Sequence, residues 1–128
     1  MIWYVAIGSA IGGVARYLLG GWIQQRSGGG FPTGTLLVNL TGSFLLGFIQ
    51  RYALETTAIS PEIRTMLTIG FCGGYTTFST FSLETVRMLE DGDWRRAMLY
   101  MGLSLVFCVG AAILGVGAAR ELIAVKRW

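Results

Sequence analysis

The sequence has no histidine and few charged residues, and both scarcities limit what the chain can do. Histidine is the commonest metal ligand and the commonest general base, so neither role can be filled in the usual way. Charged residues make up 13% of the 128 residues, against roughly 25% in a typical globular domain. With 53% hydrophobic residues and a mean hydropathy of +0.60, the composition excludes a soluble domain. There is no phosphate-binding loop or cofactor motif, and we expect no enzyme activity.

Cysteine and proline are also scarce, with two residues each. Cys72 and Cys108 both fall within apolar segments, which argues against a secreted disulfide framework and is typical of buried packing residues. Pro32 and Pro61 each stand just before an apolar run, at a helix start, where a missing N–H does no harm. The two prolines therefore mark expected helix starts.

Four stretches lack any charged side chain, and each is near or above the ~20 residues that a membrane-spanning helix needs. They cover residues 1–15, 27–50, 65–83 and 97–119, and the first continues past a single arginine, Arg16, to residue 25. We therefore predict an all-α integral membrane protein, one domain over 1–128, with four transmembrane helices near 2–25, 33–53, 62–90 and 94–124. Nothing basic precedes the first run, so we expect a retained helix rather than a cleaved signal peptide.

The third apolar run contains an unusual stretch, Gly73-Gly74, followed by five Ser or Thr residues up to Ser82. A membrane core disfavours unpaired backbone, so we expect a break in this helix that is packed in protein or lines a cavity. The freed carbonyls of such a break could hold a cation. Phe78 and Phe81 share a helix face, and aromatic ring edges carry positive partial charge. Beside a row of hydroxyls, these rings predict a pore for a small ion.

Three motifs occur in order and at the spacing of membrane helices. Residues 73–82 read G-G-Y-T-T-F-S-T-F-S, residues 12–17 read G-G-V-A-R-Y, and residues 34–42 read G-T-L-L-V-N-L-T-G. The first motif resembles the G-G-x-T-T-F-S-T-F-S pattern in the third helix of the small bacterial fluoride channels called Fluc or CrcB. The other two are similar to the first-helix and second-helix signatures of that family, so the resemblance covers nearly the whole chain.

The resemblance implies a passive, fluoride-selective channel that exports cytoplasmic fluoride, with two pores in an antiparallel homodimer of dual topology. It implies that Phe78 and Phe81 contact fluoride. It also implies a structural sodium ion (Na+) at the dimer centre, held by main-chain carbonyls that map to Gly73 and Thr76. The expected location is the cell inner membrane, with lipid, fluoride and a second copy of the chain as partners.

The basic residues are nearly balanced between the two expected sides of the membrane. Four helices place the N-terminus, the loop between the second and third helices and the C-terminus on one side. That side holds Arg51, Arg64, Arg120, Lys126 and Arg127, and the other holds Arg26, Arg87, Arg95 and Arg96. Five cations against four give no preferred orientation under the positive-inside rule, which favours pairing with an inverted copy. The scattered cations, flanked by Trp3, Trp22, Trp94 and Trp128, are typical of interfacial anchors and argue against a nucleic-acid partner.

Polar residues recur every four positions on two of the expected helices. They are Thr35, Asn39 and Ser43 on the second, and Tyr100, Ser104 and Cys108 on the fourth. Such stripes are either a hydrogen-bonding track or polar contacts between helices. We interpret Thr41, Ser43 and Cys108 as helix contacts, whereas the two amide N–H groups of Asn39 and the resemblance favour the pore. The predicted fluoride pore comprises Phe78, Phe81, Asn39, Ser79, Thr80, Thr35, Tyr100 and Ser104.

Two charged residues lie close to the expected pore. Arg16 either raises the anion concentration at a vestibule or ties two subunits together, and the sequence does not separate these roles. Glu84 is expected at the pore mouth rather than as a proton carrier.

Two alternative functions follow from the same hydropathy pattern. A small multidrug exporter would share four helices and dual topology, but it would need a mid-membrane glutamate, and the first helix carries Arg16 instead. A non-conducting membrane scaffold would need neither the Gly-Gly pair nor the two phenylalanines.

Overall fold

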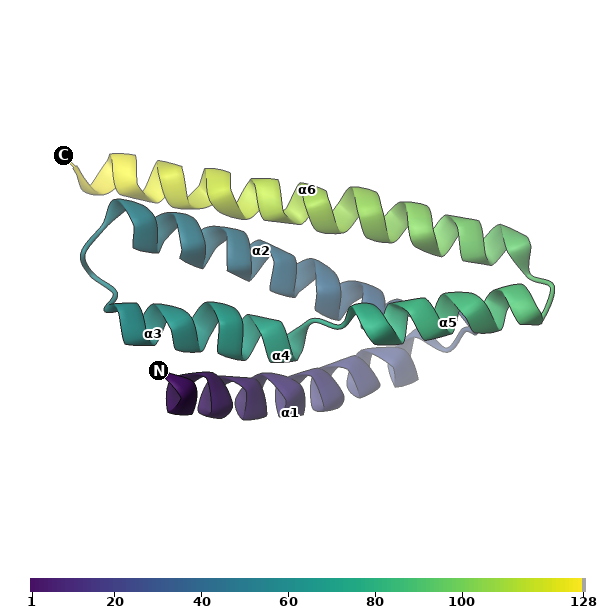
Figure 1. Ribbon diagram of the computed structural model, residues 1–128. Helices are drawn as coiled ribbons and strands as arrows, with labels where there is room; N and C mark the ends of the chain where they lie inside the picture. The colour runs from purple at the N-terminus through teal and green to yellow at the C-terminus, as the bar shows by residue number, and fades with distance from the viewer. Residues whose placement is uncertain (128) are drawn as a thin grey trace.

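A computed structural model describes residues 1–127 of the chain, so the expected interfacial residue Trp128 lies outside the described residues. The chain makes four passes along one bundle (Figure 1). Three passes are single helices: α1 (Ile2–Ser27), α2 (Thr33–Glu55) and α6 (Trp94–Lys126). The third pass consists of α3 (Pro61–Thr65), the π-helix η1 (Met66–Cys72), α4 (Gly73–Tyr75) and α5 (Phe78–Glu90). Residues 1–127 contain no β-strand, which confirms the all-α class.

The three single helices are each long and apolar enough to cross a membrane, and the third pass is not one of them because it is divided. Large apolar side chains on α6, among them Leu105, Ile113 and Leu114, are 66–68% exposed. A helix surface of this kind is stable only in contact with lipid or another apolar partner. The N-terminus, the α2–α3 loop and the C-terminus lie at the same end of the bundle (Figure 1).

Local sequence signals set where several helices begin and end. α1 stops at Gly28, whose φ of +64° is easily adopted only by glycine. Ser60 accepts a hydrogen bond from the N–H of Ile63 and places Pro61 in the first turn of α3. The side chain of Asp93 caps the start of α6 by accepting a hydrogen bond from the N–H of Arg96. These capping residues explain why the expected and observed helix starts agree closely.

The break in the third pass lies at Thr76 and Thr77, within the expected third helix over 62–90, so the expected position of the break at Gly73-Gly74 is wrong. Gly73 has helical dihedral angles (φ −63°, ψ −37°), whereas Thr76 (φ −84°, ψ 156°) and Thr77 (φ −149°, ψ 112°) are extended. Gly74 has a different role: a Cβ there would lie 2.6 Å from the carbonyl oxygen of Ser9. The absence of a side chain at Gly74 therefore allows α1 to pack closely against the third pass, whereas the extended residues Thr76 and Thr77 interrupt the helix.

Small residues bring the helices into backbone contact at two seams. Gly8 and Gly12 of α1 face the backbone of η1, and a Cβ on either would overlap it. Gly47 of α2 lies against the backbone of α6, and Gly115 of α6 lies against the backbone of α2, so a Cβ on either would also overlap the neighbouring helix. Small residues at such positions allow membrane helices to approach closely. The α2–α6 and α1–η1 seams hold the four passes together around the break.

Hydroxyl groups within the bundle are mostly satisfied by their own helix. Thr68 and Thr85, both buried, donate to the carbonyls of Arg64 and Phe81, four residues earlier, at 2.7 and 2.8 Å. Thr41 donates to Leu37 in the same way and also contacts the hydroxyl of Tyr75 at 2.9 Å. The interpretation of Thr41 as a helix contact is therefore confirmed.

Candidate functional site

A cavity of about 520 Å³ opens beside the break in the third pass. Its walls come from α2, the break itself, α5 and α6, so residues distant in sequence meet there. Four of the predicted pore residues line it, namely Asn39, Phe78, Phe81 and Ser104. Ser43 and Cys108, which we had interpreted as helix contacts only, also line this cavity. We call it the break cavity.

Asn39 holds the break open through a paired contact with one residue. Its Oδ1 accepts from the backbone N–H of Thr77 at 2.7 Å, and its Nδ2 donates to the carbonyl of Thr77 at 3.1 Å. In an uninterrupted helix the N–H of Thr77 would donate to the carbonyl of Gly73. One side-chain amide thus pairs with both backbone groups of Thr77 and replaces the helical acceptor that its N–H has lost, and the second N–H of Nδ2 has no partner among residues 1–127. That N–H is available to an anion in the break cavity.

The hydroxyls that follow the break form a cap for α5. The Thr77 hydroxyl accepts from the N–H of Thr80 at 3.2 Å and donates to the Thr80 hydroxyl at 3.0 Å, with the Ser79 hydroxyl 3.3 Å away. Neither Ser79 nor Thr80 is among the lining residues of the break cavity, so their expected position in the pore wall is not seen in this chain. The cap explains the difference, because a broken helix must satisfy the N–H groups of its new first turn.

The two phenylalanines stand at the mouth of the break cavity. Their ring centroids are 5.5 Å apart with the planes at 47°, and Phe78 is 78% exposed. Phe81 is held from behind by Tyr100, with ring centroids 5.0 Å apart. Aromatic ring edges carry positive partial charge, so a ring edge in the wall of this cavity would attract an anion.

Ser104 has a buried side-chain oxygen with no hydrogen-bond partner among the described residues. It lies on α6 in the wall of the break cavity. A buried hydroxyl without a partner is costly, so a rotation of this side chain that let the hydroxyl meet a ligand in the cavity would remove that cost.

A second cavity of about 340 Å³, which we call the arginine cavity, lies on the other side of the break and shares Thr77 with the first. Arg16, Thr35 and Glu84 line it, so Thr35 belongs here and not to the break cavity. Tyr100 is fully buried, lines neither cavity, and donates its hydroxyl to Glu84 at 3.0 Å. The polar residues of α6 therefore do not form one continuous track. Ser104 lines the break cavity, whereas Tyr100 is hydrogen-bonded to Glu84.

Arg16 is tied to the break within its own protomer. Its Nε donates to the carbonyl of Gly74 at 3.2 Å, a carbonyl that has lost its helical partner because the chain is extended at Thr76 and Thr77. The guanidinium has further N–H groups, and it lines the arginine cavity. The geometry thus gives Arg16 a structural contact at the break together with a position where it attracts anions.

The carbonyls at the break are suited to a hard monovalent cation. The N–H of Thr77 is diverted to Asn39, which removes the helical donor from the carbonyl of Gly73. The Thr76 carbonyl lies in extended backbone, and residues 1–127 contain no group of His, Cys, Asp or Glu that could hold a metal. The donor set is therefore carbonyl oxygen, which fits sodium better than a transition metal.

Sequence reasoning missed several residues of the site. Met101 lines the break cavity, as does Thr76, which was expected only to hold sodium through its carbonyl. Gln24 accepts from the N–H of Gly34 and donates to the carbonyl of Phe31, which anchors the start of α2. The π-helical turns of η1 were not expected either. No periodic signal marks these features, because each depends on a partner in another element.

The chain matches the family described as CrcB-like protein, Camphor Resistance (CrcB), over residues 3–116. It is 50% identical over 118 residues to the fluoride-specific ion channel FluC of Geobacter metallireducens, covering 92% of this chain and 95% of that one. The protein of the same name from Geobacter sulfurreducens is also 50% identical, with the same coverage. The FluC protein of Sorangium cellulosum is 46% identical over 121 residues, covering 94% of this chain and 95% of that one. A match of this extent, together with the apolar helices, identifies a multi-pass membrane protein, and the chain belongs to the CrcB-like family.

Proposed function

We propose that the protein is a fluoride-selective ion channel that lets cytoplasmic fluoride leave the cell passively. One observation carries the proposal: Asn39 with its free N–H, the rings of Phe78 and Phe81, and the residue Ser104 line the same cavity. An anion that loses its water in a low-dielectric region needs such donors and ring edges as replacements. The names of relatives that are 46–50% identical point the same way.

Transport is passive because the break cavity offers no group that could couple it to protons. No carboxylate is among its lining residues, and Glu84 lies in the arginine cavity with a hydrogen bond from Tyr100. An exporter of the small multidrug type needs a mid-membrane carboxylate for cation and proton exchange. A scaffold protein would have no use for a cavity with unsatisfied donors, so both alternatives are disfavoured.

The functional unit that we propose is an antiparallel homodimer of dual topology with two pores, in the cell inner membrane. Phe78 is 78% exposed and the break cavity is open on the same side, as expected if a second copy completes each pore. The near balance of basic residues between the two ends of the bundle supports insertion in both orientations.

We also propose that a structural sodium ion lies at the dimer centre, held by the main-chain carbonyls of Gly73 and Thr76. Gly73 is exposed on the protomer, so its carbonyl can meet an inverted copy. A bound cation would supply positive charge to oxygen dipoles that have lost their N–H partners. This chain provides the carbonyls by diverting the N–H of Thr77 to Asn39.

The test of the proposed function is fluoride efflux from liposomes that contain the purified protein. Efflux driven only by a fluoride gradient, without a proton gradient, is the expected result. Efflux that stops when the proton gradient is removed would instead indicate an exchanger, and no efflux under any condition would indicate a scaffold.

A further inference from the structure

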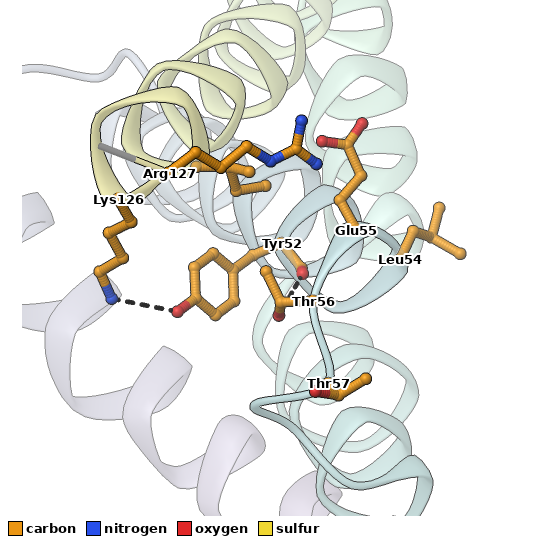
Figure 2. A pocket seen from close by; sticks show the side chains of 8 residues that line it. Tyr52, Leu54, Glu55, Thr56, Thr57, Lys126 and Arg127 are labelled. Carbon is orange, nitrogen blue, oxygen red and sulfur yellow. Dashed lines mark hydrogen bonds between the residues drawn. The ribbon is translucent and has the colours of Figure 1, made fainter.

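A separate cavity of about 440 Å³ lies where α2 and α6 end, far along the bundle from the break (Figures 1 and 2). It shares no lining residue with the break cavity or the arginine cavity. We call it the end pocket. Its polar lining residues are Tyr52, Glu55, Thr56, Thr57, Lys126 and Arg127.

The end pocket lies at the depth of lipid headgroups. α2 has 23 residues and is therefore about 34 Å long, whereas the hydrocarbon core of a bilayer is about 30 Å thick. Tyr52 and Thr56 occupy its last turn and the position just after it. α6 has 33 residues, about 50 Å, so it is longer than the hydrocarbon core, and basic residues lie at both of its ends. Lys126 at its C-terminal end thus lies at the membrane surface.

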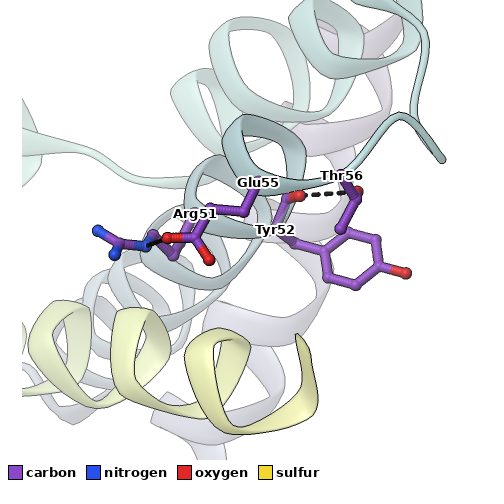
Figure 3. A network of polar contacts seen from close by, with 4 residues as sticks. All are labelled: Arg51, Tyr52, Glu55 and Thr56. Carbon is purple, nitrogen blue, oxygen red and sulfur yellow. Dashed lines mark hydrogen bonds and ion pairs between the residues drawn. The ribbon is translucent and has the colours of Figure 1, made fainter. Parts of the chain in front are cut away.

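The charge in the end pocket is positive. Lys126 and Arg127 supply two cations, and Glu55 is the single carboxylate among its lining residues within 1–127. Glu55 is already ion-paired, because its Oε1 lies 2.6 Å from Nε of Arg51, one helical turn earlier (Figure 3). The acid is therefore neutralised by a residue outside the pocket, and Lys126 and Arg127 keep an excess of positive charge there.

Hydrogen-bond donors are arranged around the same space. Lys126 Nζ donates to the hydroxyl of Tyr52 at 3.2 Å and lies 5.5 Å from its ring centroid (Figure 2). An accepting phenol still has its own O–H to donate, and an ammonium has two further N–H groups. The hydroxyl of Thr56 donates a hydrogen bond to the carbonyl of Tyr52 at 2.8 Å, so it is not free to bind a ligand (Figure 3). This bond holds the backbone just after α2 in place.

We propose that the end pocket binds the phosphate group of an anionic phospholipid. Two cations, a phenol and the loop hydroxyl of Thr57 match a phosphate, which accepts several hydrogen bonds at once. A basic pocket between membrane helices at the headgroup level is a recognised means of lipid binding. The bound headgroup fastens the ends of α2 and α6, the pair that forms one of the two main seams of the bundle. This inference requires only that the chain spans a membrane, so it is independent of fluoride conduction.

The test titrates the purified full-length protein in neutral phosphatidylcholine with phosphatidylglycerol. Native mass spectrometry counts the bound lipid, and thermal unfolding follows stabilisation. The double substitution Lys126→Gln with Arg127→Gln should lower the apparent affinity for phosphatidylglycerol by roughly 30-fold, since each surface cation contributes about 1 kcal/mol. Tyr52→Phe, which keeps the ring and removes the hydroxyl, should lower it less.

The matched control removes two cations from the opposite end of the bundle, by Arg26→Gln with Arg95→Gln. Arg26 lies 4.1 Å over the ring of Trp22, as Lys126 lies over Tyr52, so a similar stacked cation is lost. The control should bind phosphatidylglycerol as the unaltered protein does. The swap Lys126→Arg with Arg127→Lys keeps both charges and should also retain binding.

Three results would overturn the proposal. Equal affinity in the Lys126/Arg127 variant and the unaltered protein would show that these cations do not bind lipid. An equal loss in the Arg26/Arg95 control would show that only overall charge matters. Stabilisation by inorganic phosphate to the same extent as by phosphatidylglycerol would assign the pocket to a soluble anion.

Discussion

At the residue scale, the side-chain amide of Asn39 has two tasks in one position. It pairs with both backbone groups of Thr77, and its remaining N–H faces the break cavity. The sequence led us to expect only the second task. The structural contact explains why an amide suits this position better than a hydroxyl, which cannot match a peptide group with one donor and one acceptor in the same plane.

Asn39→Ala should destabilise the protein by about 1–3 kcal/mol, because the N–H of Thr77 loses its partner in an apolar region and the hydrogen bond to its C=O is also removed. Fluoride efflux should fall with it. Unfolding in mild detergent and efflux from liposomes measure the two effects. The control is Ser82→Ala, whose hydroxyl bonds only to Phe78 of its own helix and is exposed. Unchanged stability of Asn39→Ala would contradict the paired contact.

Phe78→Ile and Phe81→Ile should each reduce fluoride efflux to background while the protein still folds. Isoleucine keeps much of the side-chain bulk, but it has no ring edge to replace the water of an anion. The readout is efflux from liposomes, with size-exclusion chromatography to verify assembly. Efflux at the unaltered rate in both variants would remove the phenylalanines from the pore.

At the scale of elements, the bundle depends on close contact between helix backbones. Gly115 of α6 lies against the backbone of Phe44 in α2, whereas Gly117, two residues later, has open space where a Cβ would be. The two glycines belong to the same helix and differ in this respect. They therefore allow the packing contribution to be separated from the intrinsic cost of glycine in a helix.

Gly115→Ala should destabilise the protein by about 1–3 kcal/mol, because its new methyl group overlaps the carbonyl of Phe44. Gly117→Ala should be neutral or slightly stabilising, since alanine favours the helix and meets nothing. Thermal unfolding in detergent provides the comparison. A similar change in both variants would indicate that the α2–α6 seam tolerates extra volume.

At the scale of the whole molecule, the even distribution of basic residues bears on how the chain inserts. A reporter fused to the C-terminus should be found on both sides of the membrane in comparable amounts, because five cations at one end nearly balance four at the other. Protease protection in intact spheroplasts measures the two populations. A single orientation would remove the basis for the proposed antiparallel dimer.

Removing sodium should weaken the assembled dimer. When sodium is replaced by a bulky organic cation, fluoride efflux or dimer stability should decrease, because the carbonyls of Gly73 and Thr76 would lose their proposed partner. Thr76→Ser leaves the carbonyl in place and should have a mild effect. Full activity and dimerisation without sodium or its smaller congeners would show that no central ion is required.

The sequence by itself determined the class of the protein, its membrane-spanning segments and its family. Hydropathy is a local property, so the runs at 27–50 and 97–119 could be read directly, and Asp93 and Ser60 cap helices through neighbours three residues away. Motifs held at fixed spacing carried the family resemblance.

Only the tertiary structure decided where the third pass breaks and how the polar residues divide between two cavities. The break moves to Thr76 and Thr77 because Asn39, 38 residues earlier, pairs with the N–H and the C=O of Thr77. Arg16 supports it from 58 residues away through the carbonyl of Gly74. Tyr100 does not line the break cavity as expected, because its hydroxyl donates a hydrogen bond to Glu84 on α5. Each outcome is set by a hydrogen bond between elements, and no local pattern specifies which buried donor meets which freed carbonyl.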